Sequence, residues 1–208
     1  MRIRQREDQI RAYTTPKIRY NYRKLSWDDY ISNRYNGYRT ERSSIIPVTR
    51  IGGEIYWLLG SFWDFPKEIL SDFGGNCRTW EPPAKKGQPR PRDQERNRQA
   101  PLSCSTIELW EESKGLLVKP ILKALGTLPN NDIYIYEGLD ERKKERVIFM
   151  LLFINYDEIA NIPYEFETIK DNRFERLGPL DFYKEEDLLR GKYLTSRNLT
   201  DFINFLKR

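Results

Sequence analysis

The sequence predicts an α/β (α+β) fold in which a mixed β-sheet is sandwiched between helices. Residues 43–60 contain two β-rich runs joined by a glycine pair, and residues 146–156 form an almost continuous apolar run. Residues 103–125 and 196–208 instead place apolar and charged side chains at helical spacing. This order of strands and helices is typical of a sheet that carries helices on its faces.

The first 42 residues are predicted to be a basic extension that packs on a domain formed by residues 43–208. The extension is rich in Arg, Lys, Tyr and Asn and has no sustained apolar period. Residues 25–35 are expected to form a short helix capped by Ser26, and the rest is expected to be extended. The tyrosines of this extension could stack on nucleobases or pack on the domain, and they include Tyr13, Tyr20 and Tyr22.

Gly52 and Gly53 predict a tight hairpin within residues 43–60, because glycine supplies the positive φ that such turns need. Residues 63–70 should follow as a loop or a short strand. Residues 82–101 are rich in Pro and Arg and lack large apolar side chains, so they are expected to form a surface loop. Its basic residues are either solvated or contact phosphate or RNA: Lys85, Lys86, Arg90, Arg92, Arg96 and Arg98.

The second half of the chain is predicted to alternate helices and strands. The helix at 103–125 should begin with a cap at Ser103 or Ser105 and be divided by Gly115 and Pro120. The later elements are expected to be two strands at 132–139 and 146–156, the second of them central, a strand at 172–180, a short helix at 183–191 and a closing helix at 196–208.

The complete absence of histidine limits the chemistry that the chain can perform. It excludes His-based triads, zinc sites with His ligands and imidazole acid–base catalysis. The formal net charge of +5 is compatible with a polyanionic partner. Two cysteines cannot build a disulfide framework, and Cys104 has no His to activate it, so we expect an intracellular, reducing and cytoplasmic location. We expect no signal peptide and no membrane-spanning segment.

Three carboxylates recur on one face of the predicted helix at 103–125. Glu108, Glu111 and Glu112 lie at positions i, i+3 and i+4, so their like charges repel unless they are solvated or neutralised. Mg²⁺ or Mn²⁺ suits such a site, because these ions take oxygen ligands and activate water for phosphoanhydride hydrolysis. The plain alternative is the solvated face of a surface helix.

The context of these glutamates resembles the motif of the Nudix hydrolase family, G-x5-E-x7-R-E-U-x-E-E-x-G-U, in which U is a bulky aliphatic residue. Gly75 and Glu81 match its first part, and Glu108-Leu109-Trp110-Glu111-Glu112 matches its second part. Gly115-Leu116 follows one residue later than in the motif. The resemblance extends over residues 43–190 and is greatest to Nudix proteins of large DNA viruses.

The resemblance implies roles for individual residues. Glu111 and Glu112 would be the core metal ligands, and Glu108 would be a further ligand or the base for the attacking water. The carbonyl of Gly75 would also bind metal, with Gly74 and Glu81 supporting the motif. A later acidic residue is expected to join the site, and the candidates are Glu165, Glu167 and Glu175.

Two departures from the motif affect the expected activity. The motif places seven residues after its first Glu, whereas the Pro- and Arg-rich segment lengthens the interval between Glu81 and Ile107 to 25 residues. Ile107 also replaces the Arg that normally pairs with the first Glu, unless Arg78 or an arginine of the insertion substitutes for it. The three candidate metal ligands are retained.

We therefore expect a metal-dependent pyrophosphohydrolase that cleaves a nucleoside diphosphate linked to another group. The 5′ cap of mRNA and dinucleoside polyphosphates are candidate substrates, and the basic segments could contact RNA. A Nudix-fold protein that binds RNA, nucleotide or a protein partner with little or no catalysis is the first alternative. A basic nucleic-acid-binding domain with a fortuitous acidic helix is the second.

Overall fold

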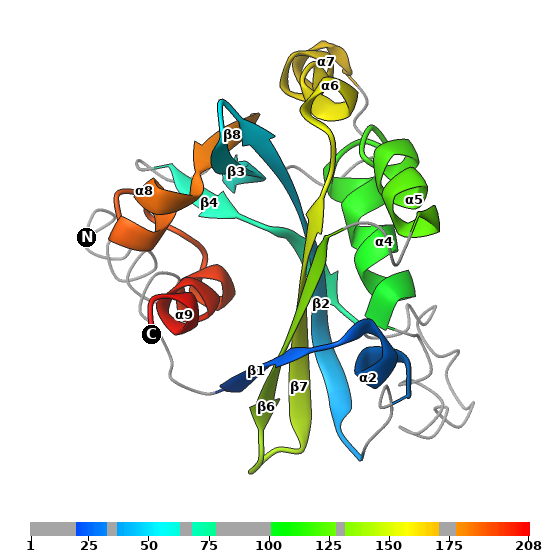
Figure 1. The fold of residues 1–208 in the computed structure, drawn as a ribbon, viewed down its shortest axis with the longest axis vertical. Coiled ribbons are helices and arrows are strands. Elements are labelled where there is room, and N and C mark those ends of the chain that lie inside the picture. The colour runs from blue at the N-terminus through cyan, green and yellow to red at the C-terminus, as the bar shows by residue number, and fades with distance from the viewer. Residues whose placement is uncertain (1–19, 33–36, 63–67, 78–100, 128–131, 171–177) are drawn as a thin grey trace, which may run out of the picture.

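The computed structural model of the protein describes residues 20–32, 37–62, 68–77, 101–127, 132–170 and 178–208. In these residues eight strands form one sheet in the order β1-β6-β7-β2-β3-β4, with β5 paired to β2 and β8 paired to β3 (Figure 1). The strands are β1 Asn21–Leu25, β2 Arg39–Ile51, β3 Glu54–Phe62, β4 Ile69–Ser71, β5 Phe73–Asn76, β6 Ile133–Asp140, β7 Glu145–Phe153 and β8 Leu180–Lys184. The β2–β7 pair is parallel and the other pairs are antiparallel, so the sheet is mixed.

Helices cover both faces of this sheet (Figure 1). They are α2 Trp27–Ser32, α4 Pro101–Glu112, α5 Val118–Gly126, α6 Tyr156–Ile159, α7 Ile162–Thr168, α8 Glu185–Arg190 and α9 Arg197–Leu206. Leu109 of α4 and Ile121 of α5 are buried in one hydrophobic core. Phe202 of α9 is buried in a second core on the opposite face, where its ring stacks on that of Phe149 with centroids 4.4 Å apart. The predicted mixed sheet between helices is confirmed.

The predicted hairpin and central strand are also confirmed. Gly52 and Gly53 have φ values of 60° and 87° and join β2 to β3. β7 lies between β6 and β2, and eight of its nine residues are buried, as expected for an apolar strand inside a sheet. The turn at these two glycines therefore fixes the register in which β2 pairs with β3.

The predicted helix at 103–125 is two helices, as Gly115 indicated, whereas Pro120 lies inside the first turn of α5 and does not divide the helix. The start of the first helix also differs from the prediction. α4 begins at Pro101, so neither Ser103 nor Ser105 is a cap. The Ser105 hydroxyl instead donates back to the carbonyl oxygen of Pro101 at 2.9 Å. This bonding to a preceding turn is a common use of serine inside a helix.

Part of the N-terminal segment forms a strand of the sheet, which its composition did not indicate. Ser26 does cap α2, because its hydroxyl oxygen accepts from the Asp29 N–H at 3.0 Å. The residues before it form β1, which pairs with β6 and is fixed there by Arg23 on Glu137 at 2.7 Å. Tyr22 packs among the rings of the second core, so it is not available to stack on a base. β2 begins at Arg39 and thus crosses the expected boundary at residue 43.

The helices of the C-terminal region agree with the prediction. The short helix α8 and the closing helix α9 lie where they were predicted. Most of the strand expected at 172–180 lies outside the described residues, and strand β8 runs over Leu180–Lys184. α6 and α7 were not predicted. No helix in the described part of the chain is long and apolar enough to cross a membrane.

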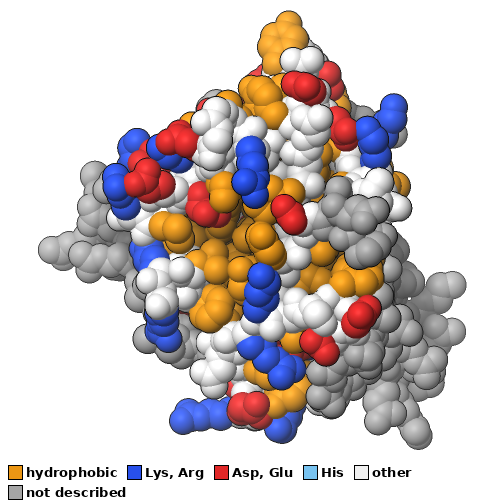
Figure 2. Space-filling model, viewed as in Figure 1, with side chains coloured by type: hydrophobic (Ala, Val, Ile, Leu, Met, Phe, Trp, Pro, Cys, Tyr) orange, Lys and Arg blue, Asp and Glu red, His pale blue; other side chains and the backbone are white. Residues whose placement is uncertain are grey.

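One face of the molecule gathers hydrophobic side chains near its centre, with Lys and Arg side chains beside them (Figure 2). Two aromatic residues, on strands β6 and β7, have a cation over their rings. The Lys24 ammonium lies 3.9 Å from the ring centroid of Tyr134, and the Arg50 guanidinium lies 5.3 Å from that of Phe153. Such cation–π contacts shield partly buried rings from water.

Candidate active site

The candidate site forms where helix α4 meets strand β5. β5 is held antiparallel to β2, with Gly74 opposite Ser44 and Gly75 opposite Ser43. A Cβ atom added to Gly75 would lie 2.0 Å from the Cδ of Glu108, well inside van der Waals contact. The Glu108 carboxylate therefore occupies the space of a side chain that Gly75 lacks, and a side chain at this position would have to displace that carboxylate.

Glu112 lies one turn further along α4 and reaches the neighbouring glycine. The Gly74 N–H donates to Glu112 Oε2 at 2.8 Å. A Cβ at Gly74 would lie 2.6 Å from the Cβ of Ser44, so this position too has no room for a side chain. The two glycines of β5 thus receive the two carboxylates that helical spacing places on one face of α4.

An ion pair lies beside this contact. Arg42 of β2 donates from Nη2 to Asp72 Oδ2 at 2.9 Å, and the Ser44 hydroxyl donates to the same oxygen. Asp72 is fully buried, and the Arg42 side chain is 16% exposed. Burial lowers the pKa of Arg42, but the carboxylates of Asp72, Glu112 and Glu108 outweigh this effect and hold its pKa above the ordinary value.

The environment of this site also changes the pKa of Glu112. Burial is the main reason that the pKa of Glu112 is raised to about 9; the charges of Asp72 and Glu108 act in the same direction, while Arg42 and the Gly74 N–H oppose the shift. The Glu112 carboxyl is therefore neutral at pH 7 unless another positive charge comes close. The local chemistry thus favours an added cation.

The donor atoms at this point are all oxygens, which is the set that Mg²⁺ prefers. Glu108 and Glu112 together with the Gly75 carbonyl fit a divalent ion that keeps several of its waters. Glu111 lies on the same helix between Glu108 and Glu112, and its side chain forms no ion pair with another described residue. Within the described ranges, no three side chains of the types His, Cys, Asp and Glu are arranged as a ready-made metal site.

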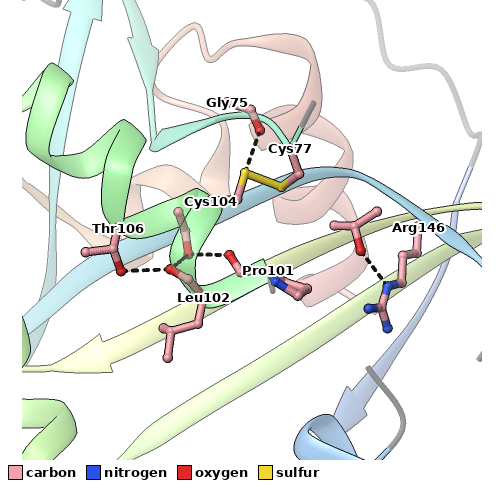
Figure 3. The surroundings of a disulfide bond; sticks show 9 residues. Gly75, Cys77, Pro101, Leu102, Cys104, Thr106 and Arg146 are labelled. Carbon is pink, nitrogen blue, oxygen red and sulfur yellow. Dashed lines mark hydrogen bonds between the residues drawn. A yellow bond between two sulfur atoms is a disulfide. The ribbon is translucent and has the colours of Figure 1, made fainter. Parts of the chain in front are cut away.

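A disulfide bond joins the end of β5 to the first turn of α4 (Figure 3). Cys77 and Cys104 are 27 residues apart in sequence, and both are buried. The Cys104 sulfur also lies 3.9 Å from the Gly75 carbonyl oxygen, in a contact without a proton because a disulfide sulfur carries none. The bond was not expected from two cysteines in a chain predicted to be reduced. It fixes both ends of the segment that contains the Pro- and Arg-rich insertion.

The other predicted site residues divide into two groups. Glu165 and Glu167 lie exposed on α7, which is tied to the end of α4 by the Lys114 ammonium. That ammonium donates to the Phe166 and Ile169 carbonyl oxygens, each at 2.8 Å. The remaining predicted residues lie outside the described residues: Glu81, Glu175, Lys85, Lys86, Arg90, Arg92, Arg96 and Arg98.

Sequence reasoning missed Arg42 and Asp72. Ile107, at the position of the motif's arginine, is 46% exposed on α4 and cannot form an ion pair. Arg42 and Asp72 lie on other elements, and nothing in their local sequence marks them as part of the site. Only the pairing of β2 with β5 brings them to the glutamates.

The chain is similar to solved structures, but no protein-family model and no curated protein matches it. Among solved structures, a C. elegans Ap4A hydrolase binary complex matches with 12% identity and a TM-score of 0.37, over 80% of this chain and 93% of that chain. A mutT/nudix family protein from Listeria innocua matches with 10% identity and a TM-score of 0.40, over 80% and 89% of the two chains.

A third solved structure is the NUDIX domain of Shewanella oneidensis NrtR complexed with ADP ribose. It matches with 9% identity and a TM-score of 0.38, over 86% of this chain and 96% of that chain. These identities and TM-scores are too low to assign the chain a family or a substrate. Function must therefore be argued from the residues of this chain.

The disulfide should contribute measurably to stability. Replacing both Cys77 and Cys104 by Ser opens a closed loop of 27 residues and should lower the free energy of unfolding by about 2–4 kcal/mol. Urea denaturation of oxidised wild type, reduced wild type and the double variant provides the measurement. The reduced wild type should match the double variant, and equal stability of all three proteins would contradict this role.

Glu112 should make the stability of the metal-free protein depend on pH. The folded state keeps a proton on Glu112 up to about pH 9, whereas the unfolded chain releases it near the ordinary value of 4.5. The free energy of unfolding should therefore fall as pH rises between these values, by at most about 1.4 kcal/mol per pH unit.

Urea denaturation at several pH values without divalent cations tests this dependence. Glu112→Gln should flatten the decline, because the amide does not titrate. Glu186→Gln on the exposed side of α8 is the matched control and should keep the wild-type slope. A Glu112→Gln profile parallel to that of the wild type would assign the dependence to another group.

Proposed function

We propose that this protein is a divalent-metal-dependent hydrolase of phosphoanhydride bonds, acting on a nucleoside diphosphate linked to a second group. One observation carries the proposal: Glu108 and Glu112 converge on Gly75 and Gly74, and Gly75, Glu108 and Glu112 belong to the motif that the sequence resembles. On a solvated surface helix the carboxylates would point into water and would not contact two glycines of a neighbouring strand. The excess of carboxylates over cations supports a bound metal ion.

Glu108, Glu112 and the Gly75 carbonyl are the groups that would hold Mg²⁺ or Mn²⁺, and Glu111 would complete the set from the same helix. When bound, the ion would polarise the diphosphate and make its bound water more acidic. Glu112 is fixed by the Gly74 N–H, which suits a ligand that must stay in place. Glu108 is positioned by its contact with Gly75 and is the carboxylate that we assign as base.

In the proposed reaction, the oxygen of a water molecule attacks one phosphorus of the diphosphate while its proton passes to Glu108. The bond from that phosphorus to the bridging oxygen breaks, and the second phosphoryl group leaves with the bridging oxygen and its electron pair. Proton transfer by a positioned carboxylate contributes about 10²–10⁴-fold to the rates of such reactions. No histidine is needed, in agreement with the composition.

The proposed substrates are polyanions that contain a diphosphate linkage to a nucleoside. Capped mRNA and dinucleoside polyphosphates both contain the required linkage, and the basic residues in 82–101 favour a polyanionic substrate. The resemblance to Nudix proteins of large DNA viruses agrees with an RNA substrate in the host cytoplasm. A non-catalytic binding protein is the alternative, favoured by Ile107 at the position of the motif's arginine.

Turnover of a substrate panel tests the proposed function directly. The panel contains capped RNA, ADP-ribose, NADH, diadenosine polyphosphates, nucleoside triphosphates and inositol pyrophosphates, each with Mg²⁺ or Mn²⁺. Glu112→Gln should reduce kcat by about 10²-fold or more, because it removes a charged ligand. Glu111→Gln tests the third ligand, and Glu186→Gln is the control that should retain full activity.

The outcome separates the two functions. Metal-dependent turnover that is lost in Glu112→Gln supports the hydrolase and identifies its substrate. A folded wild type that turns over no member of the panel, yet binds RNA or nucleotide equally well as Glu112→Gln, would favour the binding protein instead.

The basic insertion should contribute more to the binding of RNA than to the binding of small substrates. Replacing its six Lys and Arg residues by Gln should weaken capped-RNA binding at least about tenfold at low salt and reduce its salt dependence. Hydrolysis of a free dinucleoside polyphosphate should change little. Substitution, unlike deletion, leaves the loop closed by Cys77 and Cys104 at its natural length. Equal losses on RNA and on the dinucleotide would contradict this role.

A further inference from the structure

Arg42 lies in the part of β2 that pairs with β5. Residues 48–51 of β2 pair with β3, and residues 42–45 pair with β5. Arg42 is opposite Asn76, next to the pair formed by Ser43 and Gly75. Its guanidinium therefore emerges beside the strand that carries the two glycines of the candidate site.

The guanidinium is anchored on one side and faces the glutamates on the other. Its Nη2 is 2.9 Å from Asp72 Oδ2, and Asp72 is fully buried and also accepts from Ser44. Glu112 and Glu108 both interact electrostatically with the same guanidinium. A rigidly held positive charge thus lies within reach of both carboxylates that meet the glycines.

The motif lacks the arginine that would ordinarily organise its glutamates. Ile107 stands at that position, apolar and about half exposed on the surface of α4. Arg42 offers a charge of the same sign from a different element. Its geometry is also fixed, because a buried carboxylate holds it and the sheet defines the position of its backbone.

We infer that Arg42, held by Asp72, is the positioning residue of this site and keeps Glu108 and Glu112 aligned against Gly75 and Gly74 in place of the missing motif arginine. This inference rests on the proposed function, because it assigns Arg42 a role in the same metal site. Arg42 acts through the glutamates and not on the substrate. Its loss should therefore affect metal binding and kcat, with little change in KM.

The direction of the change in metal affinity distinguishes positioning from simple charge. If Arg42 only contributed a positive charge near the site, removing it would strengthen the binding of a divalent cation. If Arg42 positions the glutamates, removing it leaves them poorly aligned and weakens binding.

Calorimetric titration with Mn²⁺ alone, without substrate, is the test. Arg42→Met should bind Mn²⁺ at least about fivefold more weakly than the wild type, in the range seen when groups that orient metal ligands are removed. Arg42→Lys should recover part of the loss, because it restores the charge. The control is Arg50→Met on the same strand, whose side chain is 59% exposed and distant from the site, and it should bind Mn²⁺ normally.

A second variant covers the case in which Arg42→Met does not fold. Arg42→Met combined with Asp72→Asn removes both members of the buried pair, which proteins generally tolerate better than the loss of one partner. Thermal melting establishes that each variant is folded. With an active substrate, the folded variant should also show a kcat at least about tenfold lower and a KM within about twofold of the wild type.

Each outcome has a distinct meaning. Folded variants that bind Mn²⁺ as tightly as the wild type, or more tightly, would overturn the positioning role of Arg42. If the wild type binds Mn²⁺ and Arg42→Met binds it weakly, but no substrate is hydrolysed, the inference stands and the proposed hydrolase function fails. If the wild type binds no Mn²⁺, the metal site and the role of Arg42 both fail.

Discussion

The close approach of helix α4 to strand β5 is the constraint on which the candidate site depends. Glu108 occupies the space beside Gly75 that a side chain would fill, and Glu112 accepts the Gly74 N–H one turn later. A side chain at position 75 would displace the Glu108 carboxylate and one at position 74 would collide with Ser44, so both glycines are needed for space and not for a positive φ. The helix therefore presents its carboxylates to a strand backbone, where their spacing is fixed by helix geometry and by the pairing of β5 with β2.

This arrangement brings several carboxylates together at a small, partly buried site, and this environment changes the pKa of Glu112. Burial is the largest cause of the high pKa of Glu112, and the charges of Asp72 and Glu108 add to it, while Arg42 lowers it. A divalent cation would oppose these effects and return Glu112 to its ionised form. The Cys77–Cys104 bond then has a clear structural meaning, because it keeps the strand and the helix together despite the long segment between them.

The local parts of the fold could be predicted and the non-local parts could not. Gly52 and Gly53 mark their turn by their own conformational freedom, and Gly115 marks the break between α4 and α5 with a φ of 80°. β1 is a polar five-residue strand whose pairing depends on β6, more than one hundred residues later. The same limit applied to the site: helical spacing identified Glu108 and Glu112, whereas Arg42 becomes recognisable only once the sheet is formed.

Replacing Gly75 by Ala is the most direct test of the central claim, that the site exists because α4 packs against a glycine strand. Gly126→Ala is the matched control, because a Cβ there meets no atom within 4 Å. Both variants should remain folded by thermal melting. Direct Mn²⁺ titration should show Gly126→Ala equal to the wild type and Gly75→Ala weaker by about tenfold or more, since displaced ligands bind metal poorly. Wild-type Mn²⁺ affinity in a folded Gly75→Ala variant would contradict the account.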